Sequence, residues 1–139
     1  APTNQEEGVL GRVSRLVLDA GAFIALDRND RSMWARLAIA HQSEQQILTH
    51  AGIVGQVWRR PARQARVAQA LKGVDVRSLT VELAQAAGLL LAATGRDDVH
   101  DAALALVCEP NDVLLTSDID DLAALLTERR MSSVGMIRV

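Results

Sequence analysis

The sequence has little of several residue types, and each shortage excludes a class of protein. Of its 139 residues one is a cysteine, Cys108, which excludes an intrachain disulfide and a cysteine-based zinc site. Aromatic residues make up 2%, namely Phe23, Trp34 and Trp58, and there is no tyrosine. Proteins that recognise RNA by stacking its bases on aromatic side chains need more rings than this. The core must therefore be built from Leu, Val, Ile and Ala.

The chain also lacks a large net charge and a long apolar run. Its formal net charge of −2 at pH 7 excludes a broadly basic nucleic-acid-binding protein. No apolar run reaches the roughly 18 residues of a membrane span, and the N-terminus shows no signal-peptide pattern. We therefore expect no membrane association and a cytoplasmic location. The single thiol lies in an apolar run and is expected to be buried.

The pattern of apolar residues predicts one domain over residues 13–139, after a flexible lead-in over residues 1–12. Short strands are expected at 16–18, 46–50, 74–79, 112–117 and 135–139. Helices are expected at 20–27, 31–42, 51–60, 61–72, 80–95, 98–108 and 119–129. Strands that alternate with helices predict an α/β fold, in which a central, mainly parallel five-stranded sheet is covered on both faces.

Acidic residues are concentrated in the segment 97–128, which holds nine of them and no Lys or Arg. In a parallel sheet, functional side chains gather beyond the carboxyl ends of the strands, where Asp19 and Asp118 are expected. Asp98 and Asp101 are three residues apart and share one face of a predicted helix. Carboxylates that converge repel one another unless a cation neutralises them, and their oxygens suit Mg²⁺ or Mn²⁺. The sequence therefore predicts a metal site that contains Asp19, Asp101 and Asp118.

Helix capping is the competing interpretation of these acids. Aspartates at the start of a helix commonly accept hydrogen bonds from its first N–H groups. For Asp19 and Asp118 taken alone, capping is the simpler interpretation, and Asp120 or Asp121 could serve only as caps. The combination of Asp19 and Asp118 with Asp101, in this order of strands and helices, favours the metal site.

Three segments resemble motifs of the PIN-domain ribonucleases, and more narrowly of the VapC-type toxins of bacterial toxin–antitoxin pairs. They are LVLDAGAFIALDR at 16–28, DVHDAALAL at 98–106 and LLTSDIDDL at 114–122. These segments resemble the family's first-strand Asp, its helix-borne Asp-Ala, and its Thr-x-Asp followed by an acidic residue and Leu or Phe. The resemblance implies a three-layer α/β/α domain that hydrolyses RNA phosphodiesters with Mg²⁺ or Mn²⁺.

The resemblance also implies roles for individual residues and partners. Asp19, Asp101 and Asp118 would form the acidic cluster, with Asp98 as an auxiliary acid and Asp121 as a weaker member. The hydroxyl of Thr116 would orient Asp118 or a water molecule. The implied partners are RNA, a small antitoxin that places a basic side chain in the acidic pocket, and a second copy in a homodimer. The apolar helices around Trp34 and Ile53–Trp58 are candidate interfaces.

One position departs from the family pattern. The family usually has a glutamate on the helix after the second strand, and in the segment HAGIVGQVWRR that position is Gln56. A glutamine offers a cation one neutral oxygen and no negative charge, so it should hold a metal less tightly. The alternative is a catalytically weak or silent PIN-like module that binds RNA or a protein partner. A phospho-acceptor signalling domain is a third candidate, and the only lysine, Lys72, lies in the wrong place for it.

A basic stretch precedes the acid-rich half. Residues 59–72 contain five basic residues and no acid. If one helix runs through this stretch, Arg59, Arg63 and Arg66 form a stripe that could follow the phosphate backbone of RNA. A solvated helix face, or pairing with the acid-rich half, is an equally supported interpretation.

Overall fold

A computed structural model of the chain describes residues 14–139, so the lead-in predicted at 1–12 lies outside the described residues. The elements follow in the order β1 (Leu16–Leu18), α2 (Ala20–Asp27), α3 (Arg31–Gln42), β2 (Ile47–His50), α4 (Ala51–Val57), the 3-10 helix η1 (Pro61–Arg63), α5 (Ala65–Leu71), β3 (Asp75–Arg77), α6 (Val81–Thr94), α7 (Val99–Val107), β4 (Val113–Thr116), α8 (Ile119–Glu128) and β5 (Gly135–Arg138). The predicted order of strands and helices is confirmed. One predicted helix, at 61–72, is interrupted.

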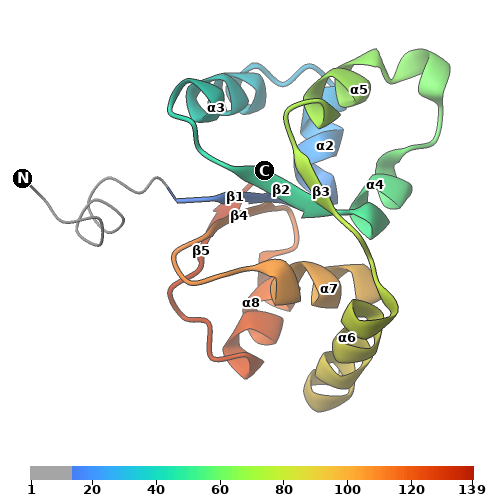
Figure 1. Cartoon of the computed structure of the whole chain (residues 1–139), viewed down its shortest axis with the longest axis vertical. Helices are drawn as coiled ribbons and strands as arrows, with labels where there is room; N and C mark the ends of the chain where they lie inside the picture. Colours follow the sequence, from blue (N-terminus) through green and yellow to red (C-terminus); the bar gives the residue numbers. More distant parts are fainter. Residues whose placement is uncertain (1–13) are drawn as a thin grey trace, which may run out of the picture.

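The five strands form one sheet, in the order β3-β2-β1-β4-β5, and every pair is parallel. Helices α2 to α5 cover one face of the sheet, and α6 to α8 cover the other (Figure 1). The predicted three-layer α/β/α architecture is confirmed. Phospho-acceptor domains of the flavodoxin-like type have the strand order 2-1-3-4-5, so the topology excludes that third candidate.

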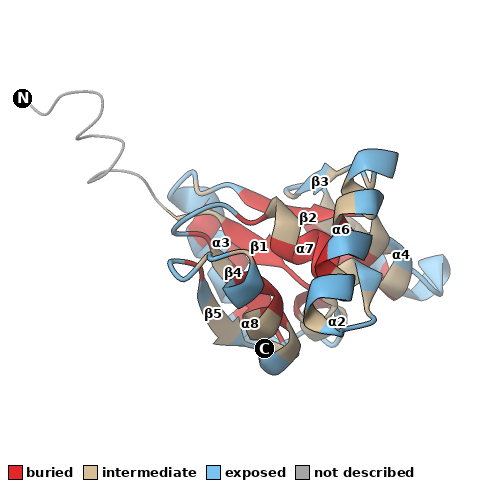
Figure 2. Ribbon diagram, turned by 90° about the horizontal axis from the view of Figure 1, so that it is seen from below, coloured by how far each residue is buried: buried red, intermediate tan, exposed pale blue. Residues whose placement is uncertain are grey.

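The core consists of aliphatic side chains, as the shortage of aromatic residues requires. Figure 2 shows the buried residues along the central strands and α7. Phe23 is fully buried, Trp34 is half-buried and donates from its indole N–H to the carbonyl of Leu26 over 3.2 Å, and Trp58 is exposed. Cys108 is buried, and this burial raises the pKa of its thiol to about 12. A thiol with such a pKa is not a nucleophile at neutral pH.

The helix predicted over 61–72 is interrupted because of the side chain of Gln64. This side chain is buried, and its Oε1 accepts the N–H groups of Arg59 and Arg60, each over 2.8 Å. Its Nε2 donates to the carbonyl of Val57 over 2.7 Å. Gln64 thus satisfies backbone groups just beyond α4 and holds a turn there. The chain then enters η1 and α5 as two separate elements rather than one continuous helix.

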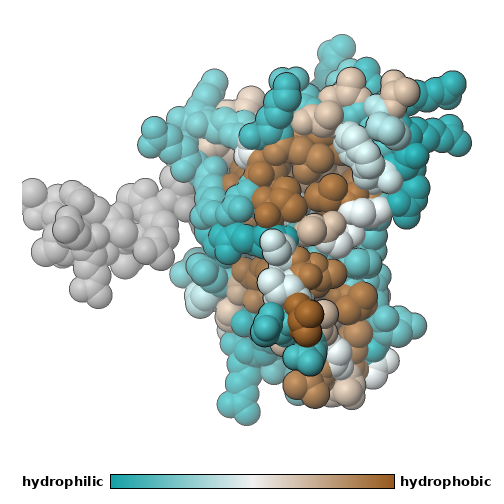
Figure 3. Space-filling model, turned by 45° about the vertical axis from the view of Figure 1, so that its right-hand side comes forward, coloured by the Kyte–Doolittle hydropathy of each residue, from teal (hydrophilic) through white to brown (hydrophobic). Residues whose placement is uncertain are grey.

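Helix α6 carries large apolar side chains on its exposed side as well as on its buried side. Val81 is 69% exposed and Leu89 75% exposed, while Ala87 and Leu90 belong to the core. Figure 3 shows hydrophobic surface, in brown, on the lower half of the face turned toward the viewer, where α6 lies. Within residues 14–139, neither this helix nor another is long and apolar enough to cross a membrane.

Candidate active site

The strand order places the candidate site between β1 and β4. These two strands are neighbours in the sheet, although most of the chain lies between them. In open parallel sheets, ligands bind outside the carboxyl ends of the strands at such a change of direction. Asp19 follows β1 directly, and Asp118 lies two residues after β4. The fold therefore brings the two strand-end acids to the same edge.

Asp19 is held in place by two hydrogen bonds. Its Oδ1 accepts the N–H of Ala20 over 2.7 Å, and its Oδ2 accepts the hydroxyl of Thr116 over 2.6 Å. The Oγ1 of Thr116 in turn accepts the N–H of Asp118 over 2.9 Å. Asp19 is thus the N-cap of α2 and, through Thr116, is also connected to the segment that carries Asp118.

Asp98 and Asp101 lie at the start of α7, and only one of them is part of the helix. Asp98 is the N-cap: its Oδ1 accepts the N–H groups of His100 and Asp101 over 2.9 and 3.1 Å. Asp101 is 5% exposed, and its Oδ2 is buried without a hydrogen-bond partner among the residues that the structure describes. Burial raises the pKa of Asp101 to about 8, and the nearby carboxylate of Asp118 adds to the effect. Burial also raises the pKa of Asp19.

Three carboxylates come close enough to share one cation. Oxygens of Asp101, Asp118 and Asp121 lie within 4.8 Å of one another, and we call these three residues the acidic cluster. Asp19 and Asp98 are outside this group of three, but their charges also raise the pKa of Asp101. A divalent cation would supply the partner that the buried oxygen of Asp101 lacks, and carboxylate oxygens suit Mg²⁺ or Mn²⁺. The residues present therefore fit the predicted kind of metal.

Gln56 lies half-buried on α4. Among the hydrogen bonds of residues 14–139, none joins its side chain to an acid of the site. The structure therefore shows nothing at Gln56 that replaces the negative charge of the family's usual glutamate.

Arg59, Arg63 and Arg66 do not form the predicted stripe, because the helix is interrupted at Gln64. The Arg59 guanidinium donates to the carbonyls of Gly55 and Trp58, and Arg66 donates to the carbonyl of Asp27 over 3.3 Å. All three arginines are exposed. In the described part of the chain they form no ion pair with the acid-rich half, which leaves a solvated surface and RNA contact as interpretations.

Two histidines at the same edge of the sheet were not predicted as site residues. His50 is the last residue of the buried strand β2, and this polar residue at a strand end was the signal that could have identified it. Its Nδ1 accepts the N–H of Gly52 over 3.0 Å, so its Nε2 carries the proton and donates to the carbonyl of His100 over 2.9 Å. Burial lowers the pKa of His50, which keeps the ring neutral at pH 7.

The two histidine rings connect β2 with α7. The rings of His50 and His100 stack with centroids 5.9 Å apart. Gly52 of α4 leaves the space for them, because a Cβ at this position would collide with both rings. The Nδ1 of His100 is buried and has no hydrogen-bond partner from residue 14 onward. Sequence reasoning also missed Arg96, which lies directly before the acid-rich segment and forms an ion pair with Asp121.

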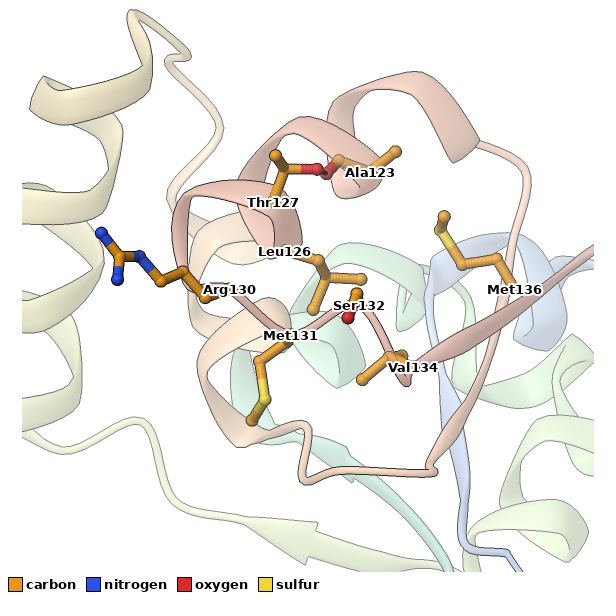
Figure 4. Close-up of a pocket in the computed structure, with 8 residues that line it drawn as sticks. All are labelled: Ala123, Leu126, Thr127, Arg130, Met131, Ser132, Val134 and Met136. Atoms are coloured by element: carbon orange, nitrogen blue, oxygen red, sulfur yellow. Dashed lines mark hydrogen bonds between the residues drawn. The ribbon is translucent and has the colours of Figure 1, made fainter.

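A separate hollow lies between α8 and β5 (Figure 4). Its volume is about 240 Å³, and it is lined by Ala123, Leu126, Thr127, Arg130, Met131, Ser132, Val134 and Met136. Its one charged side chain, Arg130, points away from the other lining residues in Figure 4. The hollow contains no residue of the acidic cluster, so it is distinct from the candidate metal site.

The all-parallel sheet, its strand order and the acids beyond β1 and β4 define a PIN-like α/β/α domain, the fold that the three motifs implied. The fold is similar to that of a chain in the crystal structure of VapBC2 from Rickettsia felis bound to a DNA fragment from their promoter. The TM-score is 0.61 with 11% sequence identity, over 89% of this chain and 98% of that chain. The sequence matches no protein-family model and no curated protein. At this identity, the similarity is one of fold.

Proposed function

We propose that this protein is a divalent-metal-dependent endoribonuclease of the VapC type, which hydrolyses RNA phosphodiester bonds and is inhibited by a cognate antitoxin. The observation that carries the proposal is the buried Oδ2 of Asp101, which has no hydrogen-bond partner in the described part of the chain and lies beside other carboxylates. A helix cap does not need such an arrangement, because a buried acid among like charges destabilises the folded protein. The three sequence motifs and the fold of the VapBC2 chain support the same activity.

The acidic cluster would hold Mg²⁺ or Mn²⁺. When bound, such a cation lowers the pKa of a water molecule and stabilises the departing oxygen of a phosphodiester. The chain's own residues supply the fixed geometry. Thr116 and the N–H of Ala20 hold the Asp19 carboxylate in one orientation. Asp98 fixes the first turn of α7, and with it the position of Asp101.

The RNA substrate would be held by phosphate contacts, because the chain has few rings for base stacking. We propose that Arg59, Arg63 and Arg66 provide such contacts, since they are exposed and have no carboxylate partner among residues 14–139. Binding of this kind weakens as salt rises, because each neutralised phosphate releases counterions.

Two protein partners belong to the proposal. A cognate antitoxin would place a basic side chain among the carboxylates, where it would relieve the same repulsion that a cation relieves. A second copy would form a homodimer. Of the predicted interface residues, Ile53 and Val57 are buried in the core, Trp34 is half-buried against it, and Trp58 is exposed. The exposed Val81 and Leu89 of α6 offer a further candidate surface for the homodimer.

The alternative function is a catalytically weak or silent PIN-like module that binds RNA or a protein, and Gln56 favours it. Cleavage of RNA by the wild type and by Asp19→Asn, each with MnCl₂ or with EDTA, separates the two functions. Asparagine also caps helices well, so the variant should keep α2 intact. Cleavage that needs Mn²⁺ and is lost in Asp19→Asn supports the enzyme. Equal cleavage by both proteins indicates a contaminant, and RNA binding without cleavage supports the silent module.

A further inference from the structure

The acidic cluster has a positive side chain of its own. Arg96 lies in the connection between α6 and α7, and its guanidinium forms an ion pair with Asp121. Asp121 lies in the first turn of α8 and is one of the three residues whose oxygens lie within 4.8 Å of one another. Arg96 therefore stands next to the place where a divalent cation would be held.

The backbone of this connection directs Arg96 toward α8. Helix α6 ends at Thr94, and Gly95 follows with a φ of 70°, a left-handed conformation that glycine adopts without a steric cost. Asp98 then caps α7, whose first turn carries Asp101. One short connection thus fixes one carboxylate of the cluster and supplies a counter-ion to another.

The other arginines near the acidic layer are engaged elsewhere. Arg129 donates to the carbonyls of Ala105 and Cys108, and Arg138 donates to the carbonyl of Ser117 over 3.3 Å. Arg15 pairs with acids at the amino ends of the strands. Among the ion pairs of residues 14–139, the pair of Arg96 with Asp121 is the one that includes a carboxylate of the cluster.

We infer that Arg96 is a built-in counter-ion, which competes with the divalent cation for Asp121 and so weakens cation binding while stabilising the metal-free protein. This inference rests on the proposed function. A guanidinium and a divalent cation repel each other, so they cannot both gain fully from the same carboxylate. The Arg96 and Asp121 side chains are 42% and 39% exposed, so solvent screens the pair and the effect is moderate.

The test measures Mn²⁺ binding and metal-free stability together. MnCl₂ is titrated calorimetrically into the full chain as wild type, Arg96→Gln, Arg96→Lys and Arg130→Gln, and each protein is melted in EDTA at pH 8. We expect Arg96→Gln to bind Mn²⁺ about 3- to 10-fold more tightly and to melt at a lower temperature. Arg96→Lys keeps a positive charge and should behave as the wild type does. Arg130→Gln is the matched control, because it removes an exposed arginine away from the cluster.

The opposite signs of the two effects distinguish competition from a structural role. A purely structural ion pair would lower the melting temperature without tightening Mn²⁺ binding, and that result would overturn the inference. If the wild type binds Mn²⁺ as tightly as Arg96→Gln does, the inference about Arg96 is also overturned, while the proposed function stands. If neither protein binds Mn²⁺, the metal dependence of the proposed function itself fails.

Discussion

The two helical layers of the molecule carry opposite charges. Residues 20–72, which contain α2 to α5, include eight basic and three acidic side chains. Residues 78–130, which contain α6 to α8, include three basic and ten acidic side chains. The net charge of −2 is thus the sum of a positive and a negative layer on opposite faces of one sheet. A near-neutral composition excludes a uniformly basic protein, but it does not exclude local contacts with cations on one side and phosphates on the other.

The acidic layer also differs between the two ends of the sheet. At the amino ends of the strands, the buried Asp112 is paired with Arg15: the Nη2 of Arg15 lies 2.7 Å from the Oδ2 of Asp112. At the carboxyl ends, Asp101 is also buried but keeps one oxygen without a hydrogen-bond partner within residues 14–139. One buried aspartate of this layer, Asp112, is therefore neutralised by an arginine, and the other, Asp101, is not paired with one in the part of the chain that the structure describes. In the proposed metal site, a divalent cation would supply the partner that the buried oxygen of Asp101 lacks.

The largest effect is expected from the loss of a carboxylate in the acidic cluster. Asp118→Asn should lower Mn²⁺-dependent RNA cleavage by about 100-fold or more, because the cation loses a charged ligand. Asp120→Asn, an exposed acid in the first turn of α8, is the matched control and should keep the wild-type rate. Similar rates for the two variants would show that the cluster is not where cleavage occurs.

Substitution by asparagine should have opposite effects on stability at the two buried aspartates, Asp101 and Asp112. With a pKa of about 8, Asp101 keeps its proton in the folded protein at pH values where the unfolded chain has released it. The metal-free protein should therefore lose stability as the pH rises from about 4 to about 8. Asp101→Asn should remove much of this loss and stabilise the protein by about 2 kcal/mol at pH 9. Asp112→Asn should destabilise it, because Arg15 loses its partner.

Unfolding in denaturant, in EDTA and over this pH range, measures both effects. If Asp101→Asn is less stable than the wild type at pH 9, the buried charge of Asp101 is neutralised by its surroundings as well as that of Asp112 is.

The packing of α4 against the His50 and His100 rings should be sensitive to a methyl group added at Gly52. Gly52→Ala places a Cβ against the His50 and His100 rings and should destabilise the protein by about 1–3 kcal/mol. Gly55→Ala, on the same helix, has open space around its Cβ and should be stabilising by about 0.5–1 kcal/mol. Urea denaturation of both variants gives the comparison. Equal changes in stability would mean that the two histidine rings are not packed tightly against α4.

A charge reversal in the basic layer should weaken RNA binding moderately. Arg63→Glu should lower RNA affinity about 3- to 10-fold at low salt and reduce the slope of log affinity against log salt by about 1. Arg130→Glu, on the acidic layer, should change neither quantity. Fluorescence anisotropy with labelled RNA over a range of NaCl concentrations measures both. If Arg63→Glu leaves the salt dependence of RNA affinity unchanged, Arg63 does not contact RNA and is part of the solvated surface.

The smallest effect is expected at Gln56. Gln56→Glu restores a negative charge at the family's usual position and should tighten Mn²⁺ binding about 2- to 3-fold. Gln69→Glu adds the same charge at an exposed position of α5 and is the matched control. Calorimetric titration with MnCl₂ compares the two. Equal affinities would indicate that Gln56 lies outside the metal site.

The sequence predicted the layers and the strand-end acids because both depend on local patterns. Short apolar runs that each end at a polar residue fix where a parallel strand stops, and therefore where Asp19 and Asp118 lie. The interruption at Gln64 could not be predicted in this way. Its three hydrogen bonds go to backbone groups of residues 57–60, and apolar periodicity carries no information about such contacts.

The partners of charged side chains were equally beyond the sequence. Spacing placed Asp98 and Asp101 on one helical face, but it could not show that Asp98 would be used as the cap while Asp101 was left with a free oxygen. Nor could it show that Arg96 would reach Asp121 rather than the adjacent Asp97. These outcomes depend on how α6, α7 and α8 pack against one another, which only the folded structure defines.

The most direct test of the metal site is a crystal structure determined in the presence of MnCl₂, with anomalous data collected at the manganese absorption edge. We predict an anomalous peak for a manganese ion that is bonded to carboxylate oxygens of Asp101 and Asp118, at the carboxyl ends of β1 and β4. A map that shows manganese only elsewhere, or none at this edge of the sheet, would contradict the assignment of these acids to a metal centre.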